Sequence, residues 1–285
     1  MAERLAQGLR RVRADNPGPL TGPGTNSYIL GEGAVAVIDP GPEDARHLAA
    51  LEAALARGER ISHVVVTHAH VDHSRLARPL AARWQAPVLA FGAAAAQRPP
   101  AFEGLGGGEG VDTEFAPDIR LTDGATIEGD GWRLTALWTP GHMGDHLCLL
   151  WGEAAFSGDH VMGWASTVVS PPDGDMAAYM ASLDKLAAAS PRILFPGHGD
   201  PVADPAARIA ELRAHRRGRE AAILSHLGAA PQDIGTLTRA IYTETPATLL
   251  AAAERNVLAH LLDLCARGAA VSDGPAGPHA LFRRG

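Results

Sequence analysis

Short apolar runs alternate with stretches of helical periodicity over roughly the first two hundred residues of the chain. The apolar runs are typical of buried strands. They predict strands at residues 27–31, 34–39, 61–67, 87–90, 133–139, 147–151, 154–157 and 193–196. The stretches between them predict helices at 43–57, 74–83 and 175–188, with Ser74 and Asp175 as expected caps. This alternation favours a layered α/β architecture, with helices covering the sheets on both faces.

The pattern changes from Pro205 onward. A basic helix is expected at 208–227, a short helix at 234–242 and a third at 247–267, where apolar residues recur at helical spacing. Two strand-like pieces, 269–272 and 279–283, flank a turn rich in Gly and Pro. Three helices and a hairpin predict a winged-helix unit. We therefore expect two domains, residues 1–204 and residues 205–285.

A glycine-rich segment interrupts the first domain at residues 101–117. It has no periodic apolar pattern, so it predicts a loop. Two interpretations stay open, a mobile flap near a functional site and a surface insertion.

The composition narrows the class of protein. The chain has only two cysteines, Cys148 and Cys265, which excludes a disulfide framework and a cysteine metal site. Cys148 lies in an apolar strand and is expected to fill the core. The N-terminus lacks the apolar stretch of a secretory signal, and no run of about 18 apolar residues marks a membrane span. These observations favour a cytoplasmic protein without a membrane partner.

The charge is unevenly distributed along the chain. Residues 205–285 carry ten Arg and seven acidic residues, a balance of +3, whereas the preceding part carries 15 Lys or Arg and 25 acidic residues, a balance of −10. The acidic part disfavours broad attraction to nucleic acid. Local cationic contacts are expected from four arginines near the C-terminus, Arg216, Arg217, Arg219 and Arg255.

The strongest chemical pattern follows the apolar run that ends at Val66. His68, His70, Asp72 and His73 stand within six positions, directly after a predicted buried strand. Such a strand delivers all four side chains to one edge of a sheet. Imidazole and carboxylate groups at this density suit zinc and similar first-row metals. The segment therefore predicts a metal site.

Three later segments repeat this arrangement, each with one candidate ligand just past a predicted strand. His142 follows a Pro-Gly turn after residues 133–139, Asp159 follows Ser-Gly, and His198 follows Pro-Gly after residues 193–196. Each segment alone is weak evidence. Together with the first cluster they predict a site assembled on one rim of a sheet sandwich.

In their order along the chain, these motifs resemble those of the metallo-β-lactamase superfamily. The resemblance implies a four-layer αββα sandwich as the fold of the first domain. It also implies one metal held by His68, His70 and His142 and a second held by Asp72, His73 and His198, with Asp159 bridging the two. Asp39, in Val-Ile-Asp-Pro-Gly, would orient ligands by hydrogen bonds. The alternative for Asp39 is a turn residue at a strand end.

Two zinc ions held in this way would lower the pKa of a shared water, which falls to about 7 on a single zinc. The hydroxide would attack a carbonyl carbon or a phosphorus, and Asp72 would both ligate and orient it. The sequence thus predicts a binuclear, zinc-dependent hydrolase of an ester, thioester, amide or phosphodiester.

A closer resemblance, to the β-lactamase-like protein 2 subgroup, rests on three features. These are the segment from Leu20 to Tyr28, the Ser-Pro-Pro-Asp-Gly-Asp segment from Ser170, and the C-terminal winged unit. The resemblance leaves two substrates open, single-stranded RNA and a small (thio)ester of the kind that glyoxalase II hydrolyses. The chain departs from the common pattern at Ser74-Arg-Leu, where Gly-Gly is usual, and this changes one wall of the cleft.

Three further residues are candidates for contact with the substrate. Asn26 and Tyr28 lie in and after the Gly-Pro-Gly-Thr-Asn loop, for which a tight turn before the first strand is the alternative. His146, like His160, stands just beyond a predicted ligand, where it would act as a proton carrier or a substrate donor, or would be a packing residue.

Two other classes of function compete with the hydrolase. One is an oxygenase with a single iron on the same scaffold, which the complete two-metal ligand set disfavours. The other is a nucleic-acid-binding regulator with a structural metal site. The winged unit has three open roles, namely nucleic-acid binding, covering of the cleft and formation of a homodimer.

Overall fold

The first layer of strands is a seven-stranded sheet. The computed structural model describes residues 2–94 and 97–285. The strands run in the order β1 (Glu3–Ala6), β2 (Leu9–Arg13), β3 (Asn26–Leu30), β4 (Ala34–Ile38), β5 (Arg60–Val65), β6 (Val88–Ala90) and β7 (Ile119–Arg120). β1 to β4 pair antiparallel and β4 to β7 pair parallel. β4 and β5 therefore end at the same edge of this sheet.

A second sheet packs face to face on the first. Its order is β12 (Ile193–Pro196), β11 (Ala154–Gly158), β10 (Leu147–Trp151), β9 (Trp132–Trp138) and β8 (Thr126–Gly129). β9, β11 and β12 run in one direction, because β10 is antiparallel to both of its neighbours and β11 is parallel to β12. Apolar side chains from both sheets, such as Leu30, Ile38 and Phe156, form the core between them.

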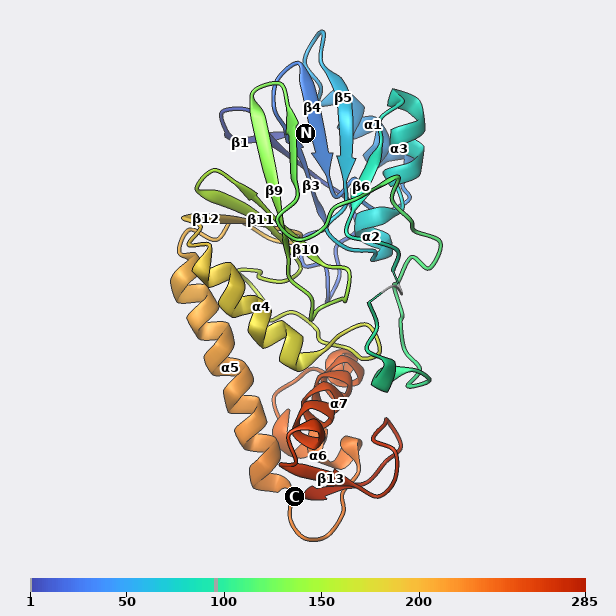
Figure 1. The fold of residues 1–285 in the computed structure, drawn as a ribbon, viewed down its shortest axis with the longest axis vertical. Coiled ribbons are helices and arrows are strands. Elements are labelled where there is room, and N and C mark those ends of the chain that lie inside the picture. The colour runs from blue at the N-terminus through green and yellow to red at the C-terminus, as the bar shows by residue number, and fades with distance from the viewer. Residues whose placement is uncertain (1, 95–96) are drawn as a thin grey trace.

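Helices cover only the outer face of each sheet. α1 (Ala45–Ala53) and α3 (Ala77–Trp84) pack on the first sheet, and α4 (Met176–Ala188) and α5 (Pro205–His226) pack on the second. Figure 1 shows these two sets of helices on opposite sides of the sheets. The four-layer αββα sandwich is confirmed. In the part of the chain that the structure describes, neither sheet has helices on both faces, because the inner faces are buried against each other.

The C-terminal part has its own apolar core. It contains α6 (Ile234–Ile241), a 3-10 turn at Ala247–Leu249, α7 (Leu250–Ala266) and a hairpin of β13 (Ala270–Ser272) and β14 (Phe282–Arg284). This is the expected winged-helix unit, and it lies below the sandwich in Figure 1. The first half of α5 packs on the sandwich and its second half on the winged unit. The division between residues 204 and 205 stays a prediction.

Several local predictions differ from the structure. Four short strands were not predicted, namely β1, β2, β7 and β8. Ser74 is not a cap, since it is the last residue of the short helix α2 (Val71–Ser74), and its hydroxyl donates to the carbonyl of His70 and to Asp112. Asp175 does cap α4, where its side chain accepts from the backbone N–H of Ala178.

The glycine-rich segment packs on two neighbours. It includes a 3-10 turn at Pro100–Phe102, and Phe102 and Leu105 pack on the core of the winged unit. At its other end Val111 forms a β-bridge with His70. The segment therefore links the winged unit to the edge that carries the histidine cluster. In the described parts of the chain, no helix combines the length and apolarity needed to cross a membrane.

Candidate metal centre

The predicted ligand residues converge at one rim of the sandwich, because the strands that precede them end there. They form two groups, His68, His70, His142 and Asp159 in one, and Asp72, His73 and His198 in the other, and within each group the ligand atoms lie within 4.8 Å of one another. These residues come from segments spread over about half of the chain.

The ring nitrogens face each other at distances that suit a shared cation. In the first group His70 Nδ1 lies 3.0 Å from His68 Nε2 and 3.1 Å from His142 Nε2. In the second group His73 Nε2 and His198 Nε2 are 3.3 Å apart. One ring proton satisfies at most one of the two contacts of His70, so lone pairs are left pointing at each other. The donor set thus fits metal ions.

Asp159 lies between the two groups. One carboxylate oxygen is 3.5 Å from His73 Nε2, and the other is 3.3 Å from His198 Nε2 and 3.8 Å from His142 Nε2. Its buried Oδ1 has no hydrogen-bond partner among the described residues. A buried carboxylate oxygen without a partner is costly, which is a second indication that cations belong here.

Burial sets the protonation of the first group. It lowers the pKa of His68 well below the usual value and that of His70 to about 3, and the neighbouring histidines add to the effect for His68. Burial also lowers the pKa of His142. Neutral imidazole is the form that binds a metal, so these three side chains are ready to ligate at neutral pH.

Neighbouring charges set the protonation of the second group. Burial opposes a proton on His73, but Asp72, Asp159 and Asp39 together raise its pKa to about 10. Burial likewise opposes charge on Asp159, yet His198 and His73 keep the pKa of this carboxyl well below its usual value. A metal ion that binds here must therefore displace a proton from His73.

Asp39 holds both groups from behind. It is buried, and it accepts from the backbone N–H of Thr67 at 2.7 Å, from the Thr67 hydroxyl at 2.8 Å and from His73 Nδ1 at 3.0 Å. The Thr67 hydroxyl also lies 3.0 Å from His68 Nδ1. One carboxylate is therefore connected to ligand residues of both groups, to His73 directly and to His68 through Thr67.

The turn that carries His142 is fixed by α4 and by the segment before it. The Ser182 hydroxyl donates to the carbonyl of Pro140 at 2.7 Å, and the backbone N–H of Asp175 donates to the carbonyl of Gly141. His142 Nδ1 lies 2.7 Å from the carbonyl of Val168. This contact leaves Nε2 for a metal.

Two residues that contact metal-ligand segments were not predicted from the sequence. The Thr25 hydroxyl donates to Asp72 at 2.8 Å and receives a hydrogen bond from Asn16. Buried Asp145 accepts from the backbone N–H of Ala69, between two ligands. No sequence pattern marks either residue as part of the site, so only the folded chain reveals them.

Asn26 and Tyr28 are not placed as residues that contact a substrate would be. Both are fully buried. Asn26 donates to the carbonyls of Pro196 and Gly199, and the Tyr28 hydroxyl donates to that of Pro196 at 2.7 Å. They hold the segment that carries His198, and their polar groups are already used. Contact with a substrate is therefore not their role in this structure.

His146 is also buried, with no exposed surface. Its Nδ1 lies 3.0 Å from the Thr139 hydroxyl, and its Nε2 accepts from the backbone N–H of Asp159 at 3.2 Å. It thus positions the loop of Asp159. His160 is buried against the ring of Tyr179, so both histidines follow the packing interpretation. Cys148 is a core residue as expected, and burial raises the pKa of its thiol to about 12.

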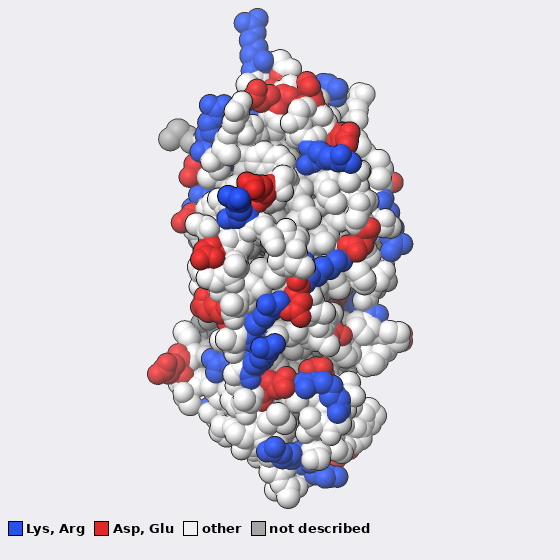
Figure 2. All heavy atoms as spheres, turned by 60° about the vertical axis from the view of Figure 1, so that its left-hand side comes forward, with Lys and Arg blue, Asp and Glu red and all other residues white. Residues whose placement is uncertain are grey.

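Most of the arginines that were expected to contact phosphates contact other groups of the protein instead. Arg216 is buried and donates to Asn256, whereas Arg219 stacks on the ring of Tyr242 at 4.3 Å. Arg255 donates to Ser170 and to the carbonyl of Gly106. Of the four arginines only Arg217 is exposed. Figure 2 shows acidic and basic side chains interspersed on the displayed face, among the described residues, and no extended field of one sign.

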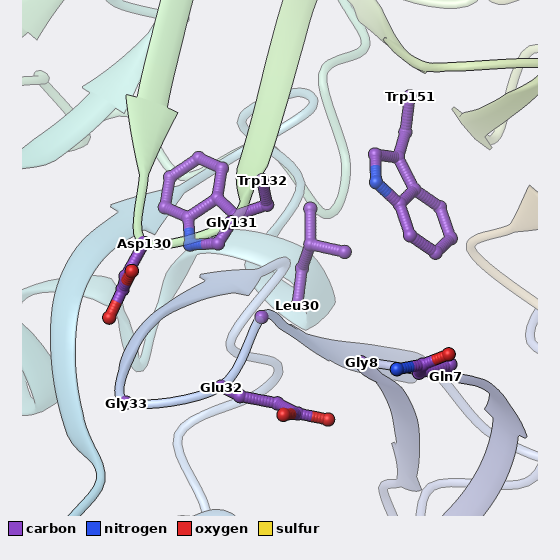
Figure 3. A pocket seen from close by; sticks show the side chains of 10 residues that line it. Gln7, Gly8, Leu30, Glu32, Gly33, Asp130, Gly131, Trp132 and Trp151 are labelled. Atoms are coloured by element: carbon purple, nitrogen blue, oxygen red, sulfur yellow. The ribbon is translucent and has the colours of Figure 1, made fainter.

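A shallow hollow of about 600 Å³ lies at the other end of the sandwich. Figure 3 shows it between the turn that connects β3 and β4 and the turn that connects β8 and β9, with Trp132 and Trp151 beside it. Its only charged residues are Glu32 and Asp130. It lacks the ligand-type side chains of the metal centre, which sits at the opposite end of β4.

Comparison with known families finds two matches. Residues 20–198 match the metallo-beta-lactamase superfamily, and residues 234–277 match the beta-lactamase associated winged helix domain. The first match covers more than half of the chain and includes all seven ligand-type residues.

Individual proteins agree with both matches. A beta-lactamase-like protein 2 homolog from Caenorhabditis elegans is 31% identical over 279 residues, which cover 93% of this chain and 87% of that protein. An atrochrysone carboxyl ACP thioesterase from Aspergillus fumigatus is 31% identical over 255 residues, covering 87% of this chain and 74% of that protein. The crystal structure of a metallo-beta-lactamase family protein from Thermus thermophilus has a TM-score of 0.79 and 26% identity, and covers 99% of this chain and 100% of that one.

Proposed function

The chain belongs to the metallo-beta-lactamase superfamily and is a hydrolase with a His/Asp metal site, and we propose that it is a binuclear zinc thioesterase. The observation that carries this proposal is the convergence of seven ligand-type side chains in two adjacent groups. Two groups of nitrogen and oxygen donors suit two zinc ions better than one octahedral oxygen-ligated ion.

The geometry supports an assignment of ligand residues to the two ions. His68, His70 and His142 would hold the first ion, and Asp72, His73 and His198 the second. Asp159 contacts ligands of both groups, which supports a bridging role. When bound, the ions supply an activated water and electrostatic stabilisation of the carbonyl oxygen.

Asp72 is the side chain that we assign to orientation of the nucleophile. Its side chain is 20% exposed, more than that of Asp159 at 11%, so it is the more accessible of the two to solvent. Thr25 fixes it with a hydrogen bond of 2.8 Å, and Asn16 fixes Thr25 in turn. An oriented carboxylate at this place can accept a proton from a water molecule that enters the cleft.

Thioesters are the substrate class that the relatives and the charges favour together. The Aspergillus fumigatus relative bears the name of a thioesterase. Single-stranded RNA is the weaker candidate, because residues 1–204 carry a balance of −10 and three of the four arginines expected to contact phosphates are engaged internally.

The test combines metal analysis with a substrate panel. The panel contains an acyl thioester of N-acetylcysteamine, S-lactoylglutathione, single-stranded RNA, a chromogenic phosphodiester and a chromogenic lactam. We expect two zinc equivalents per chain and the highest kcat/KM on a thioester. His70→Ala and Asp159→Ala should each abolish turnover, while His226→Ala, which removes an exposed histidine at the end of α5, should leave it unchanged.

Three results would replace this function by another. One iron equivalent with consumption of oxygen would indicate the oxygenase. Salt-dependent binding of duplex DNA without turnover of any substrate would indicate the regulator. Cleavage of RNA at a higher kcat/KM than any thioester would make the protein a nuclease with the same metal centre.

A further inference from the structure

A tryptophan stands exposed beside the second ligand group. Trp164 is 44% exposed, and it is one of only five large apolar side chains in the described residues that are exposed. Its indole lies against Gly199, the residue after His198. A second member of the five, Leu20 at 55% exposure, lies on the loop whose Gly22 contacts the six-membered ring of the indole.

Two glycines make room for the indole. A Cβ atom on Gly199 would lie 2.5 Å from Trp164 Cδ1, and a Cβ atom on Gly22 would lie 3.0 Å from Cζ2. Both glycines have positive φ angles, +80° and +55°, which other residues rarely adopt. The ring is thus seated closely between the two loops, while nearly half of the residue still faces solvent.

The backbone around Trp164 is held as well. Arg208, from α5, donates to the carbonyls of Met162 and Ala165 at 2.8 Å each and so clamps the segment on both sides of the indole. Scattered apolar residues on a surface need no explanation. A tryptophan that is exposed, clamped and next to a ligand is different, because the protein keeps a large apolar surface in a fixed place.

The loop opposite the indole also belongs to the site. Gly18 and Gly22 exchange two backbone hydrogen bonds, which close a tight turn with Leu20 near its tip. A few residues further on, Thr25 contacts Asp72 and forms a β-bridge with His198. The turn is therefore rigidly connected to the second ligand group.

The charged side chains near the indole are engaged with partners. Asp200, which follows Gly199, pairs with Arg11 at 3.2 Å and with Arg13 at 3.3 Å. Arg208 has its guanidinium occupied by two carbonyls and by Glu211. The exposed face of the indole therefore offers apolar surface, which an uncharged chain or ring would cover favourably.

We propose that Trp164, with Leu20, is the acyl-binding platform of the enzyme, and that it selects thioesters with a long apolar or aromatic acyl group. The proposal rests on the thioesterase function and specifies its substrate. With the thioester carbonyl at the ligand groups, the acyl chain would extend over the indole face. Tryptophan offers a large and rigid contact area for such a chain.

The experiment compares thioesters that differ only in the acyl group. Acetyl, hexanoyl and decanoyl thioesters of N-acetylcysteamine are tested with the zinc-loaded enzyme and with Trp164→Ala, Trp164→Phe and Leu20→Ser. Trp164→Ala should lower the ratio of kcat/KM for decanoyl to that for acetyl about tenfold, mainly through KM. Trp164→Phe should retain most of the ratio, and Leu20→Ser should lower it less. Ile119→Ala, an exposed apolar residue on β7, is the matched control and should not change it.

A binding measurement separates this proposal from the function on which it rests. Titration calorimetry with S-decyl-N-acetylcysteamine, a thioether that cannot be hydrolysed, should show about tenfold weaker binding to Trp164→Ala, with unchanged zinc content and melting temperature. Equal losses for acetyl and decanoyl substrates, or equal thioether affinities, would overturn the platform alone. If the parent enzyme turns over no thioester but cleaves another member of the panel, the thioesterase proposal fails and the acyl platform fails with it.

Discussion

Replacement of Asp39 by asparagine tests how the buried carboxylate prepares the metal centre. The side chain keeps its shape, but one acceptor oxygen becomes an NH₂ donor. If the amide oxygen keeps the hydrogen bond from the backbone N–H of Thr67, now 2.7 Å, the NH₂ group faces His73 Nδ1. His73 must then carry its proton on Nε2, the nitrogen that faces His198 and Asp159, or lose the contact.

The size of the effect follows from the bonds that change. A hydrogen bond to a charged group contributes about 1.5–3 kcal/mol, and loss of such a support typically weakens metal affinity about 10–100-fold. The second group should suffer most, because Asp39 contacts His73 directly. The first group should change less, because Asp39 reaches His68 only through Thr67.

The assay is competition for zinc between the metal-free protein and a chromogenic chelator, which resolves a strong and a weak site. Asp145→Asn is the matched control, because Asp145 is also a buried carboxyl near the ligands. Burial raises the pKa of Asp145 well above its usual value, which favours the neutral carboxyl that an amide resembles. We expect its zinc affinities to stay within about threefold of the parent. Equal losses in both variants, or no loss in Asp39→Asn, would refute the reasoning.

Three further predictions concern the site and the stability of the fold. Gly197→Ala would place a Cβ atom 2.4 Å from Asp159 Oδ1 and 2.6 Å from His73 Cε1, so it should remove zinc and activity while the melting temperature changes little; normal zinc stoichiometry would contradict this. Because the pKa of His73 is about 10 without metal, zinc binding at pH 7.5 should release a proton, and zinc affinity should rise with pH. Calorimetry in buffers of different ionisation enthalpy detects the released proton. Burial lowers the pKa of His260 to about 3 in the folded chain, whereas an exposed histidine of the unfolded chain takes up a proton near pH 6.5. The free energy of unfolding should therefore fall as the pH drops from 6.5 toward 3, by about 2 kcal/mol at pH 5. Urea unfolding at pH 7.5 and pH 5 should show that His260→Leu lacks this part of the loss.

The convergence of the ligand-type side chains could be predicted because strand ends are visible in the sequence. Apolar runs end shortly before His68, His142, Asp159 and His198. Residues that follow strands of the same direction lie at the same edge of the sheet. The αββα sandwich followed only through the family resemblance. The pattern alone suggested helices on both faces of each sheet, since a strand buried by another sheet and a strand buried by helices are equally apolar.

The missed strand β2 and the misassigned residues Asn26 and Tyr28 have a common physical cause, which is polar groups that are buried by pairing. β2 reads Leu-Arg-Arg-Val-Arg, yet Arg11 is only 5% exposed because it pairs with Glu3 and donates to the carbonyl of Gly199. Asn26 and Tyr28 were assigned to the substrate for the same reason. Their partners come from β12 and the loop after it, about 170 positions later. No local sequence pattern indicates such a contact.

The winged unit and the metal centre are connected by a chain of hydrogen bonds, and this connection bears on the open role of that unit. Asn256 in α7 accepts at 3.1 Å from the backbone N–H of Val169 and from Arg216 in α5. Arg216 also donates to the carbonyl of Thr167, whose hydroxyl lies 3.1 Å from His142 Nδ1. A buried guanidinium left without partners is costly, so loss of α7 would release the segment that holds His142. Through these contacts the buried face of the winged unit supports the segment that holds His142. Nucleic-acid binding or dimer formation would have to use its remaining, solvent-facing surfaces.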